Sequence, residues 1–346
     1  MDKETVQTNK SDTMSNWLTY TLEERKVMLQ KSSAEERLPD YAVEKDWWVT
    51  MTLKALFQTG CADKLTFKGG TSLSKGWNLI QRFSEDIDLA LSHSYFGITP
   101  SSNSQLLKLR KLSHKYLTQD FVAELDAELH TVGLQGYKLY PVIEKDGRAV
   151  DSDADPTMLV LEYPSISEHH SQYVPAAVKI EISCLSMEEP FEIKEISTII
   201  SKHYPEDDLG TSAKIPTVLP ERTFLEKAFL LCEEFQKNEP RSYRMSRHLY
   251  DLDRLKDTEY GKRALADDQL YTNIVEHRRK FYHVGYADYD KDYRDRIEFY
   301  PPDNCIKAWE SDYNDLLTSF VYGDRKTFAE LLASIAELQT RFRNGE

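Results

Sequence analysis

Two patterns of hydrophobic and polar positions alternate in the first part of the chain. Apolar residues at helical spacing predict helices, whereas segments in which apolar and polar residues alternate predict strands. The expected helices cover residues 15–31, 41–59, 72–81 and 104–131. The expected strands cover residues 65–67, 83–91, 137–145, 157–164 and 174–186. An acidic stretch, 146–155, fits a hairpin turn, and the mixture of elements predicts an α+β domain.

The second part of the chain is predicted to be mainly helical. From about residue 217, apolar residues recur at helical spacing, and Pro220 suits the first turn of a helix. The expected helices cover residues 220–236, 243–256, 260–283, 303–319 and 325–343. Gly, Pro and Ser residues within 205–216 indicate a boundary. We therefore expect disorder over 1–13, an α+β domain over 14–205 and a helical domain over 206–346.

A pair of glycines lies between the expected strand 65–67 and the expected helix 72–81. Gly69 and Gly70 allow the backbone to turn tightly and to approach a ligand with no side chain in the way. The free N–H groups at the start of the helix then point at an anion. Thr71 or Ser72 can cap that helix or donate a hydrogen bond to a phosphate oxygen. The segment therefore predicts a phosphate-binding turn.

Two aspartates follow the glycines, the first of them 16 residues after Gly70. Side chains alternate across a strand, so Asp86 and Asp88 share one face of the expected strand 83–91. Two carboxylates on one face repel each other unless a cation lies between them, and Mg²⁺ binds a few carboxylates together with phosphate oxygens. Ser84 points to the same side, which makes it a candidate nucleotide contact or modification site.

Each half of this unit is common on its own. A Gly-Gly pair before a helix is frequent in turns, and an Asp-x-Asp pair occurs on many solvated edge strands. Their combination in strand–turn–helix–strand order is more specific and indicates nucleotide chemistry. The Walker A pattern G-x-x-x-x-G-K-[ST] is absent, which disfavours a P-loop NTPase.

Composition is that of an ordinary soluble protein. The 346 residues suffice to bury a sizeable core, and 40% are hydrophobic while 29% are charged. No apolar run approaches the roughly 20 residues that span a bilayer, and residues 1–14 contain no apolar signal-peptide region. The four cysteines, Cys61, Cys184, Cys232 and Cys305, are scattered, which argues against a zinc site or a disulfide framework. We therefore expect a cytoplasmic protein with no membrane partner.

The net charge of −14 is unfavourable for a nucleic-acid partner, because phosphate backbones need local positive charge. Its distribution matters more than the sum, and the chain contains three basic clusters. These are Lys108, Arg110, Lys111 and Lys115; Arg241, Arg244 and Arg247; and Arg278, Arg279 and Lys280. For each cluster we favour a solvated helix face, and the alternative is a track that binds nucleic-acid phosphates. The tyrosines near the third cluster could stack on an RNA end, and acidic surface could equally serve a basic protein partner.

Four motifs resemble, in order, those of the AbiEii-type nucleotidyltransferase-like toxins. The family's glycine turn and carboxylate pair resemble 69–71, Gly-Gly-Thr, and 82–89, Arg-Phe-Ser-Glu-Asp-Ile-Asp-Leu. Its motif on an early helix is similar to 44–48, Glu-Lys-Asp-Trp-Trp. Its Glu-Arg-Thr-x-x-Glu-Lys helix is similar to 221–227, and its Arg-His-x-x-Asp-Leu element to 247–252. The family comprises the toxin halves of bacterial abortive-infection toxin–antitoxin pairs.

The resemblance implies that residues 14–205 form a nucleotidyltransferase-like mixed-sheet domain. In this superfold a third carboxylate on a neighbouring strand completes the metal site, and Glu181 is the natural candidate. Alternation places Glu181 on the polar face of its strand. The alternative is an exposed strand glutamate, which would leave the ion to Asp86 and Asp88.

The resemblance also implies roles for residues of the helical part. Lys227 would neutralise the phosphates of the departing pyrophosphate. Asp251 would deprotonate the attacking hydroxyl or orient that lysine. Arg222 and Glu226 are four residues apart and are expected to pair along a helix. On the early helix, Lys45 and Asp46 fit structural support as well as direct contact.

The expected site therefore has three groups of residues, which overlap at the carboxylates. The catalytic residues are Asp86, Asp88, Lys227 and Asp251; the nucleotide-binding residues are Gly69, Gly70, Thr71, Ser72, Lys75 and Ser84; and the metal ligands are Asp86, Asp88 and Glu181. The expected cofactor is Mg²⁺, with Mn²⁺ as the alternative ion, and the substrate is a nucleoside triphosphate.

By resemblance, the expected reaction transfers a nucleoside monophosphate to the 3′ end of a tRNA and releases pyrophosphate. Blocked aminoacylation would stop translation, and growth arrest would limit phage, with a cognate antitoxin encoded nearby. Three alternatives stay open: modification of a protein side chain (AMPylation), a nucleotide-binding regulator without turnover, and a toxin that acts by binding a partner protein.

Overall fold

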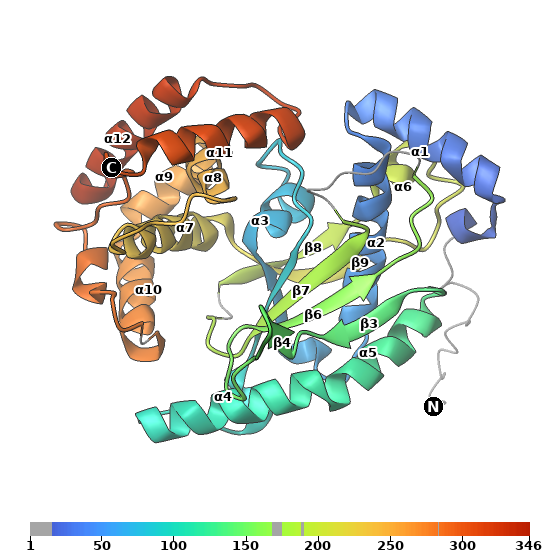
Figure 1. Ribbon diagram of the computed structural model, residues 1–346, viewed down its shortest axis with the longest axis horizontal. Helices are drawn as coiled ribbons and strands as arrows, with labels where there is room; N and C mark the ends of the chain where they lie inside the picture. Colours follow the sequence, from blue (N-terminus) through green and yellow to red (C-terminus); the bar gives the residue numbers. More distant parts are fainter. Residues whose placement is uncertain (1–15, 168–174, 188–189, 283) are drawn as a thin grey trace, which may run out of the picture.

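The computed structural model describes residues 16–167, 175–187, 190–282 and 284–346 (Figure 1). The segment expected to be disordered, 1–13, lies outside these residues. Figure 1 shows a sheet in the centre of the molecule, with the helices of the C-terminal part, α7 to α12, gathered on one side of it. The fold is therefore a mixed α+β sheet followed by a mainly helical region, as expected from the sequence.

A seven-stranded mixed sheet, counted over the described residues, has the order β3-β6-β7-β2-β1-β9-β8. Its strands are β1 (Leu65–Lys68), β2 (Ile87–Leu91), β3 (Lys138–Pro141), β6 (Thr157–Glu162), β7 (Ala177–Ser183), β8 (Phe191–Ile196) and β9 (Ala213–Val218). At its centre, β2 pairs antiparallel with β1 and parallel with β7. The hairpin expected around the turn 146–155 is formed by β3 and β6, which pair antiparallel, and β4 (Glu144–Lys145) and β5 (Arg148–Ala149) form a smaller hairpin within their connection.

Helices cover the sheet and build the second half of the molecule. Those of the first half are α1 (Leu22–Glu36), α2 (Asp40–Leu56), α4 (Asn103–Thr118), α5 (Asp120–Thr131) and α6 (Ile199–His203). Those of the second half are α7 (Pro220–Glu234), α8 (Ser246–Leu255), α9 (Glu259–Ala266), α10 (Asp268–Phe281), α11 (Ile306–Ser319) and α12 (Phe328–Asn344). No helix among the described residues has the length and apolar character needed to cross a bilayer.

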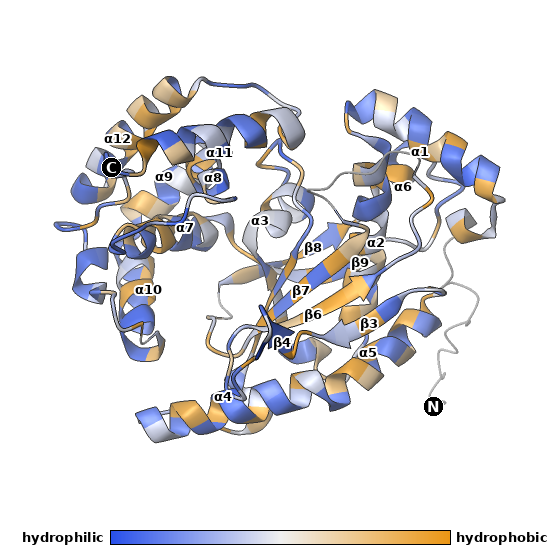
Figure 2. Ribbon diagram, viewed as in Figure 1, coloured by the Kyte–Doolittle hydropathy of each residue, from blue (hydrophilic) through white to orange (hydrophobic). Residues whose placement is uncertain are grey.

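Two hydrophobic cores hold these layers together. The first lies between the sheet and α2, whose Trp47 and Val43 are fully buried. The second lies within the helical half and includes Leu73 and Ile80 from the segment after the glycines. Figure 2 shows apolar residues running along β6 and alternating with polar residues along α4. Because Leu73 and Ile80 pack among the C-terminal helices, the glycine segment is anchored to both halves.

The segment between the glycines and the aspartates is less regular than predicted. A helical turn, α3 (Gly69–Thr71), continues as the π-helical turn η4 (Ser72–Gly76), so the helix expected to reach residue 81 ends at Gly76. The strand expected from residue 83 begins at Ile87. Phe83 instead donates its N–H to the carbonyl of Phe320, 2.8 Å away, which draws this segment toward the helical half.

Two expected long helices are each divided. Gln119 separates α4 from α5 with a non-helical backbone conformation. Asp267 separates α9 from α10, and its side chain caps α10 by accepting a hydrogen bond from Leu270 N–H. Continuous apolar spacing cannot reveal these breaks, because the residues on both sides of each break still bury one face.

The sequence pattern does not predict strands β8 and β9, although β9 pairs parallel with β1 near the glycines. β8 is an edge strand with exposed Phe191 and Ile193, so its two faces do not alternate between apolar and polar. β9 contains Pro216, which favours a loop or an edge strand in sequence terms. The sheet therefore continues past residue 205, where the sequence pattern suggests a boundary.

Candidate active site

Three charged side chains lie in a row across the central strands. Asp88 on β2 is directly opposite Lys68 on antiparallel β1 and directly opposite Glu181 on parallel β7. Asp86 lies one residue before β2 begins. The apolar residues of β7 that alternate with Glu181 are fully buried, as the sequence pattern predicts. The sheet pairing therefore brings the predicted carboxylates together.

The glycine turn lies against this row. Gly69 has a φ of +80°, and a Cβ atom there would collide with the carboxylate of Asp88. A Cβ at Gly70 would lie 2.6 Å from the guanidinium of Arg82 and 3.0 Å from the hydroxyl of Ser84. Both positions thus need glycine because the backbone passes close to the site.

Thr71 and Ser72 stabilise the turn from behind. The hydroxyl of Thr71 donates to the carbonyl of Asp86 at 2.5 Å and contacts the hydroxyl of Ser84 at 2.9 Å. The hydroxyl of Ser72 donates to the carbonyl of Gly69 at 2.8 Å. Both side chains are fully buried, so their bonds position the loop and do not reach into the cavity described below.

Lys75 lies away from the other predicted residues. Its ammonium forms an ion pair with Asp46 and donates to the carbonyl of Ser197 at 3.1 Å. Asp46 also accepts a hydrogen bond from the N–H of Ile199 at 2.8 Å. The lysine therefore joins η4 to α2 and to the start of α6, and the structure does not bring it to the carboxylates.

In the helical half, Lys227 on α7 forms an ion pair with Asp251 on α8 at 2.8 Å. Arg82 binds the same carboxylate through two hydrogen bonds of 2.7 Å. Burial alone would raise the pKa of Asp251, but Arg82 and Lys227 hold it below its ordinary value. Asp251 has no exposed surface, so of its two predicted roles the geometry fits orientation of Lys227.

A cavity of about 330 Å³ collects the other predicted residues. Its lining includes Gly69, Gly70, Ser84, Asp86, Asp88, Glu181 and Lys227. Sequence reasoning misses further lining residues, among them Lys68, Thr223, Arg247 and His248. The guanidinium of Arg247 lies 3.7 Å from Asp86, so the basic cluster interpreted as a solvated helix face contributes a cation to the cavity.

Two buried polar atoms that line this cavity, the hydroxyl of Thr223 and Nδ1 of His248, have no hydrogen-bond partner among the described residues. Burial, followed by the charges of Lys227 and Arg247, lowers the pKa of His248 well below its usual value. The imidazole is therefore neutral at pH 7. Unpaired buried polar atoms are costly, and a bound polar ligand would satisfy them.

Burial and mutual repulsion disfavour the charged forms of Asp88 and Glu181. Burial first, then the charges of Asp88 and Asp86, raise the pKa of Glu181 to about 7. Burial and Asp86 also raise the pKa of Asp88, although Lys68 opposes this effect. Within the described residues, no three His, Cys, Asp or Glu side chains converge closely enough to hold a metal ion alone. Mg²⁺ commonly uses one or two carboxylates plus substrate phosphates, so the carboxylates fit an ion whose remaining ligands come from a triphosphate.

The early-helix motif supports the site from outside the cavity. Lys45 forms a buried ion pair with Glu85 at 2.6 Å, and Arg244 binds the other oxygen of Glu85 at 2.7 Å. Glu44 accepts hydrogen bonds from Ser165 and from the N–H of Ile166. The motif thus fixes the backbone next to Asp86 without contacting the cavity itself.

Comparison with known families identifies this arrangement. The family described as "Nucleotidyl transferase AbiEii toxin, Type IV TA system" matches residues 52–334, which include the glycine turn and the cavity residues. The chain belongs to this family. It is therefore a nucleotidyltransferase of a toxin–antitoxin system, which uses a nucleoside triphosphate and has a cognate antitoxin.

Two further comparisons accompany this AbiEii assignment. A search of curated proteins found no match. Among solved structures, the AbiEii-family fold described above is similar to MenT4, a nucleotidyltransferase toxin from Mycobacterium tuberculosis. That similarity covers 92% of this chain and 89% of MenT4, with 16% sequence identity and a TM-score of 0.48.

Proposed function

We propose that this protein transfers a nucleoside monophosphate from a nucleoside triphosphate to the 3′-terminal hydroxyl of a tRNA, with Mg²⁺ as cofactor. The observation that carries the proposal is the row formed by Asp88 and Glu181 on paired strands, with Gly69 in close approach to Asp88. Cations and unpaired hydrogen-bonding groups line the same cavity. Carboxylates beside a cavity that is also lined by Lys227 and Arg247 fit phosphoryl chemistry.

The β- and γ-phosphates would lie along the glycine turn, facing Lys227 and Arg247. The ammonium of Lys227 is held by Asp251, so it is positioned before the substrate arrives and loses little freedom on binding. The hydroxyl of Thr223 can donate to a phosphate oxygen, which gives its unpaired buried proton an acceptor.

Asp86 and Asp88 would hold the Mg²⁺ ion, or Mn²⁺ in its place, together with phosphate oxygens of the substrate, and Glu181, opposite Asp88, is the candidate for a further ligand. A bound ion would supply positive charge that stabilises the phosphate oxygens and favours ionisation of the acceptor hydroxyl. The acceptor oxygen forms a bond to the α-phosphorus, and the bond from that phosphorus to the β-phosphate oxygen breaks. The hydroxyl proton passes to a carboxylate of the cluster, and Lys227 and Arg247 stabilise the departing pyrophosphate.

The acceptor is proposed from the resemblance to the AbiEii family. Addition of one nucleotide to the 3′ end would block aminoacylation, arrest growth and so limit phage spread, with the antitoxin opposing the effect. The net charge of −14 requires local cations for RNA, and Arg241 and Arg247 supply them at the cavity.

Label transfer tests the proposal. Purified protein is incubated with each α-labelled nucleoside triphosphate, Mg²⁺ and total bacterial RNA, in parallel with the Asp88→Ala variant. We expect label in tRNA-sized bands with the wild-type protein and none with the variant. Label in protein but not in RNA would assign an AMPylation-type activity instead. Toxicity that persists in Asp88→Ala cells without any label would overturn the enzymatic proposal.

A further inference from the structure

A second cavity, of about 450 Å³, adjoins the first at the carboxylate row. Lys68, Asp88 and Glu181 line both this cavity and the one described above. The second cavity lies between the sheet half, represented by β2, β7 and α4, and the helical half, represented by α7 and α10. Cavities of this size between two halves of a protein commonly hold small molecules.

We propose that this second cavity is a nucleoside-binding subsite, which takes the base and ribose of a nucleotide whose phosphate lies at Asp88 and Glu181. The inference rests on the proposed function, because a nucleotidyl transfer places a nucleoside beside the reacting phosphorus. The structure supports it through the charge balance of the walls, the aromatic surface and the position of the cavity.

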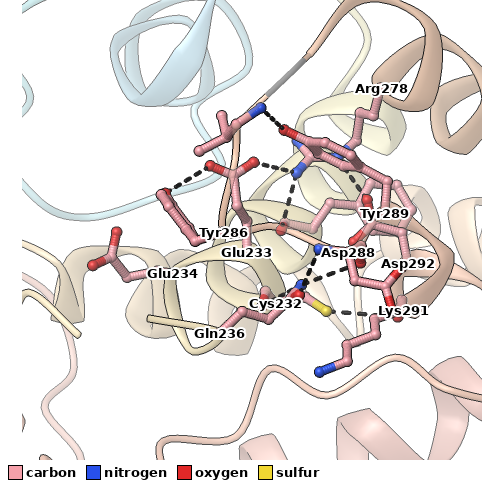
Figure 3. A network of polar contacts seen from close by, with 12 residues as sticks. Cys232, Glu233, Glu234, Gln236, Arg278, Tyr286, Asp288, Tyr289, Lys291 and Asp292 are labelled. Carbon is pink, nitrogen blue, oxygen red and sulfur yellow. Dashed lines mark hydrogen bonds and ion pairs between the residues drawn. The ribbon is translucent and has the colours of Figure 1, made fainter. Parts of the chain in front are cut away.

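The charged groups on the helical wall are neutralised within the protein. Arg278 binds Asp292 at 2.7 Å and Glu233 at 2.9 Å, so its positive charge is compensated by two carboxylates of its own network (Figure 3). The N–H of Val284 donates to Tyr289 in the same network. This wall is therefore preformed, and the stretch of basic and aromatic residues noted in the sequence is largely structural at this point.

The charged groups on the sheet side also have partners within the protein, an ion pair for Arg110 and neutral hydrogen-bond donors for Asp155. Arg110 lies 3.2 Å from Asp153, and Asp155 accepts hydrogen bonds from Ser183 and from the N–H of Cys184. These walls are therefore largely satisfied within the protein, with Nε of Arg110 as a buried donor that has no hydrogen-bond partner among the described residues.

The carboxylates that need a cation, Asp88 and Glu181, lie where the two cavities meet, and Lys227 and Arg247 line the first cavity. We therefore assign the phosphates to the first cavity and an uncharged nucleoside to the second.

An aromatic surface lines the same space. His277, Phe281 and Tyr282 contribute rings, and those of His277 and Phe281 lie 4.4 Å apart. The carbonyl of Leu185 accepts a hydrogen bond of 2.6 Å from Nε2 of His277. Burial lowers the pKa of His277 to about 4, so the ring is neutral at pH 7 and Nδ1 is an acceptor. Rings that stack and one fixed acceptor suit a nucleobase.

Nucleotide binding by the full-length protein tests the subsite without requiring turnover. Tyr282→Ala removes a ring from the cavity, Tyr282→Phe retains it, and Tyr140→Ala removes an exposed tyrosine from β3. Affinities are measured for ATP, GTP, CTP and UTP and for inorganic tripolyphosphate. We expect Tyr282→Ala to weaken binding of the preferred nucleotide by about 10-fold or more, the scale of one stacked base. Tripolyphosphate affinity should stay at the wild-type level in every variant.

A nucleoside can also reach this cavity as the terminal residue of the acceptor. In that case, Tyr282→Ala leaves all four nucleotide affinities intact but weakens binding of tRNA by a similar factor, and tRNA trimmed at its 3′ end shows no such loss. Either pattern supports a nucleoside subsite and assigns its source. Unchanged affinity for both ligands in a folded Tyr282→Ala protein would overturn it.

A second variant keeps the test independent of Tyr282. Leu106→Trp fills the cavity from α4, whereas Leu112→Trp adds the same bulk on an exposed position of that helix outside the cavity. Loss of nucleotide or tRNA affinity in Leu106→Trp but not in Leu112→Trp supports the subsite. Equal affinities of the two variants for both ligands contradict it. Wild-type protein that binds nucleotides but transfers no label would refute the proposed function while leaving the binding results interpretable.

Discussion

The ammonium of Lys227 lies 2.8 Å from the carboxylate of Asp251, which Arg82 also binds through two hydrogen bonds. One fully buried anion thus positions two cations, one of them from the segment that joins the glycines to Asp86. The geometry explains why an aspartate outside the cavity is needed: without it, two buried positive charges would repel each other.

Asp251→Asn should therefore weaken both folding and nucleotide binding. Loss of the charge leaves Lys227 and Arg82 uncompensated, and breaking a buried ion pair costs about 3–5 kcal/mol. We expect a lower thermal midpoint and a raised KM for the nucleotide, measured by thermal denaturation and label transfer. Asp257→Asn, which removes an exposed ion pair with Arg341, is the control and should change stability by less than about 1 kcal/mol.

Asp88→Asn should strongly reduce transfer without destabilising the protein. Burial and the neighbouring Asp86 disfavour the charged form of this carboxylate, so removal of the charge relieves repulsion. Transfer should fall by about two to three orders of magnitude, the scale of losing one preorganised electrostatic contact. An unchanged or higher thermal midpoint is expected in the absence of metal. A strongly lowered midpoint would show that Asp88 is a structural residue.

Addition of Mg²⁺ with a nucleoside triphosphate should stabilise the wild-type protein. A ligand that binds the folded state contributes about 2.7 kcal/mol at 100 times its dissociation constant. The thermal midpoint should therefore rise with ligand concentration, and chelation should reverse the rise. The same titration of Glu181→Gln decides whether Glu181 is a metal ligand. A smaller rise in thermal midpoint than in the wild-type protein would assign it as a ligand, and an equal rise would leave the ion to Asp86 and Asp88.

Gly69→Ala should inactivate the protein through a steric collision. Its φ of +80° disfavours a side chain, and the added Cβ would displace the carboxylate of Asp88. Gly97→Ala is a matched control, because Gly97 also has a positive φ of +62° but open space around its Cβ position. Both variants should lose about 1 kcal/mol from backbone strain, and we expect only Gly69→Ala to lose label transfer as well.

Lys45→Met tests the support provided by the early helix. Lys45 and Glu85 are almost completely buried, and loss of the ammonium leaves Arg244 as the ion-pair partner of Glu85 within the described part of the chain. We expect destabilisation of about 3–5 kcal/mol, measured by denaturant unfolding. Lys64→Met, which removes an exposed pair with Asp63, should cost less than about 1 kcal/mol.

Local sequence patterns are sufficient to predict many of the residues that line the candidate site. Gly69 and Gly70 are recognisable because their role depends on local backbone geometry. Asp86 and Asp88 are recognisable because two residues two apart share a face of an extended segment. Glu181 follows from family resemblance together with alternation along its strand. In each case the deciding information lies within a few residues of the position concerned.

The residues that these patterns miss depend on contacts between distant segments. Lys68 gains significance because β1 pairs with β2 in a register that places it opposite Asp88. Arg247, interpreted as part of a solvated face, also lines the cavity, with its guanidinium 3.7 Å from Asp86. That distance depends on how α8 packs. Lys75, a predicted nucleotide contact, forms its ion pair with Asp46 from α2 instead.

The sequence by itself determined the family, through the resemblance of its motifs, and the two short elements that line the candidate site. It also predicted most of the helical and extended segments, because these depend on local spacing. The tertiary structure alone decided strand order, the membership of β8 and β9 in the sheet, and the pairing of Asp251 with Lys227 and Arg82. Such contacts join residues far apart in the chain. They are selected by packing and charge compensation within the whole fold, which no local pattern records.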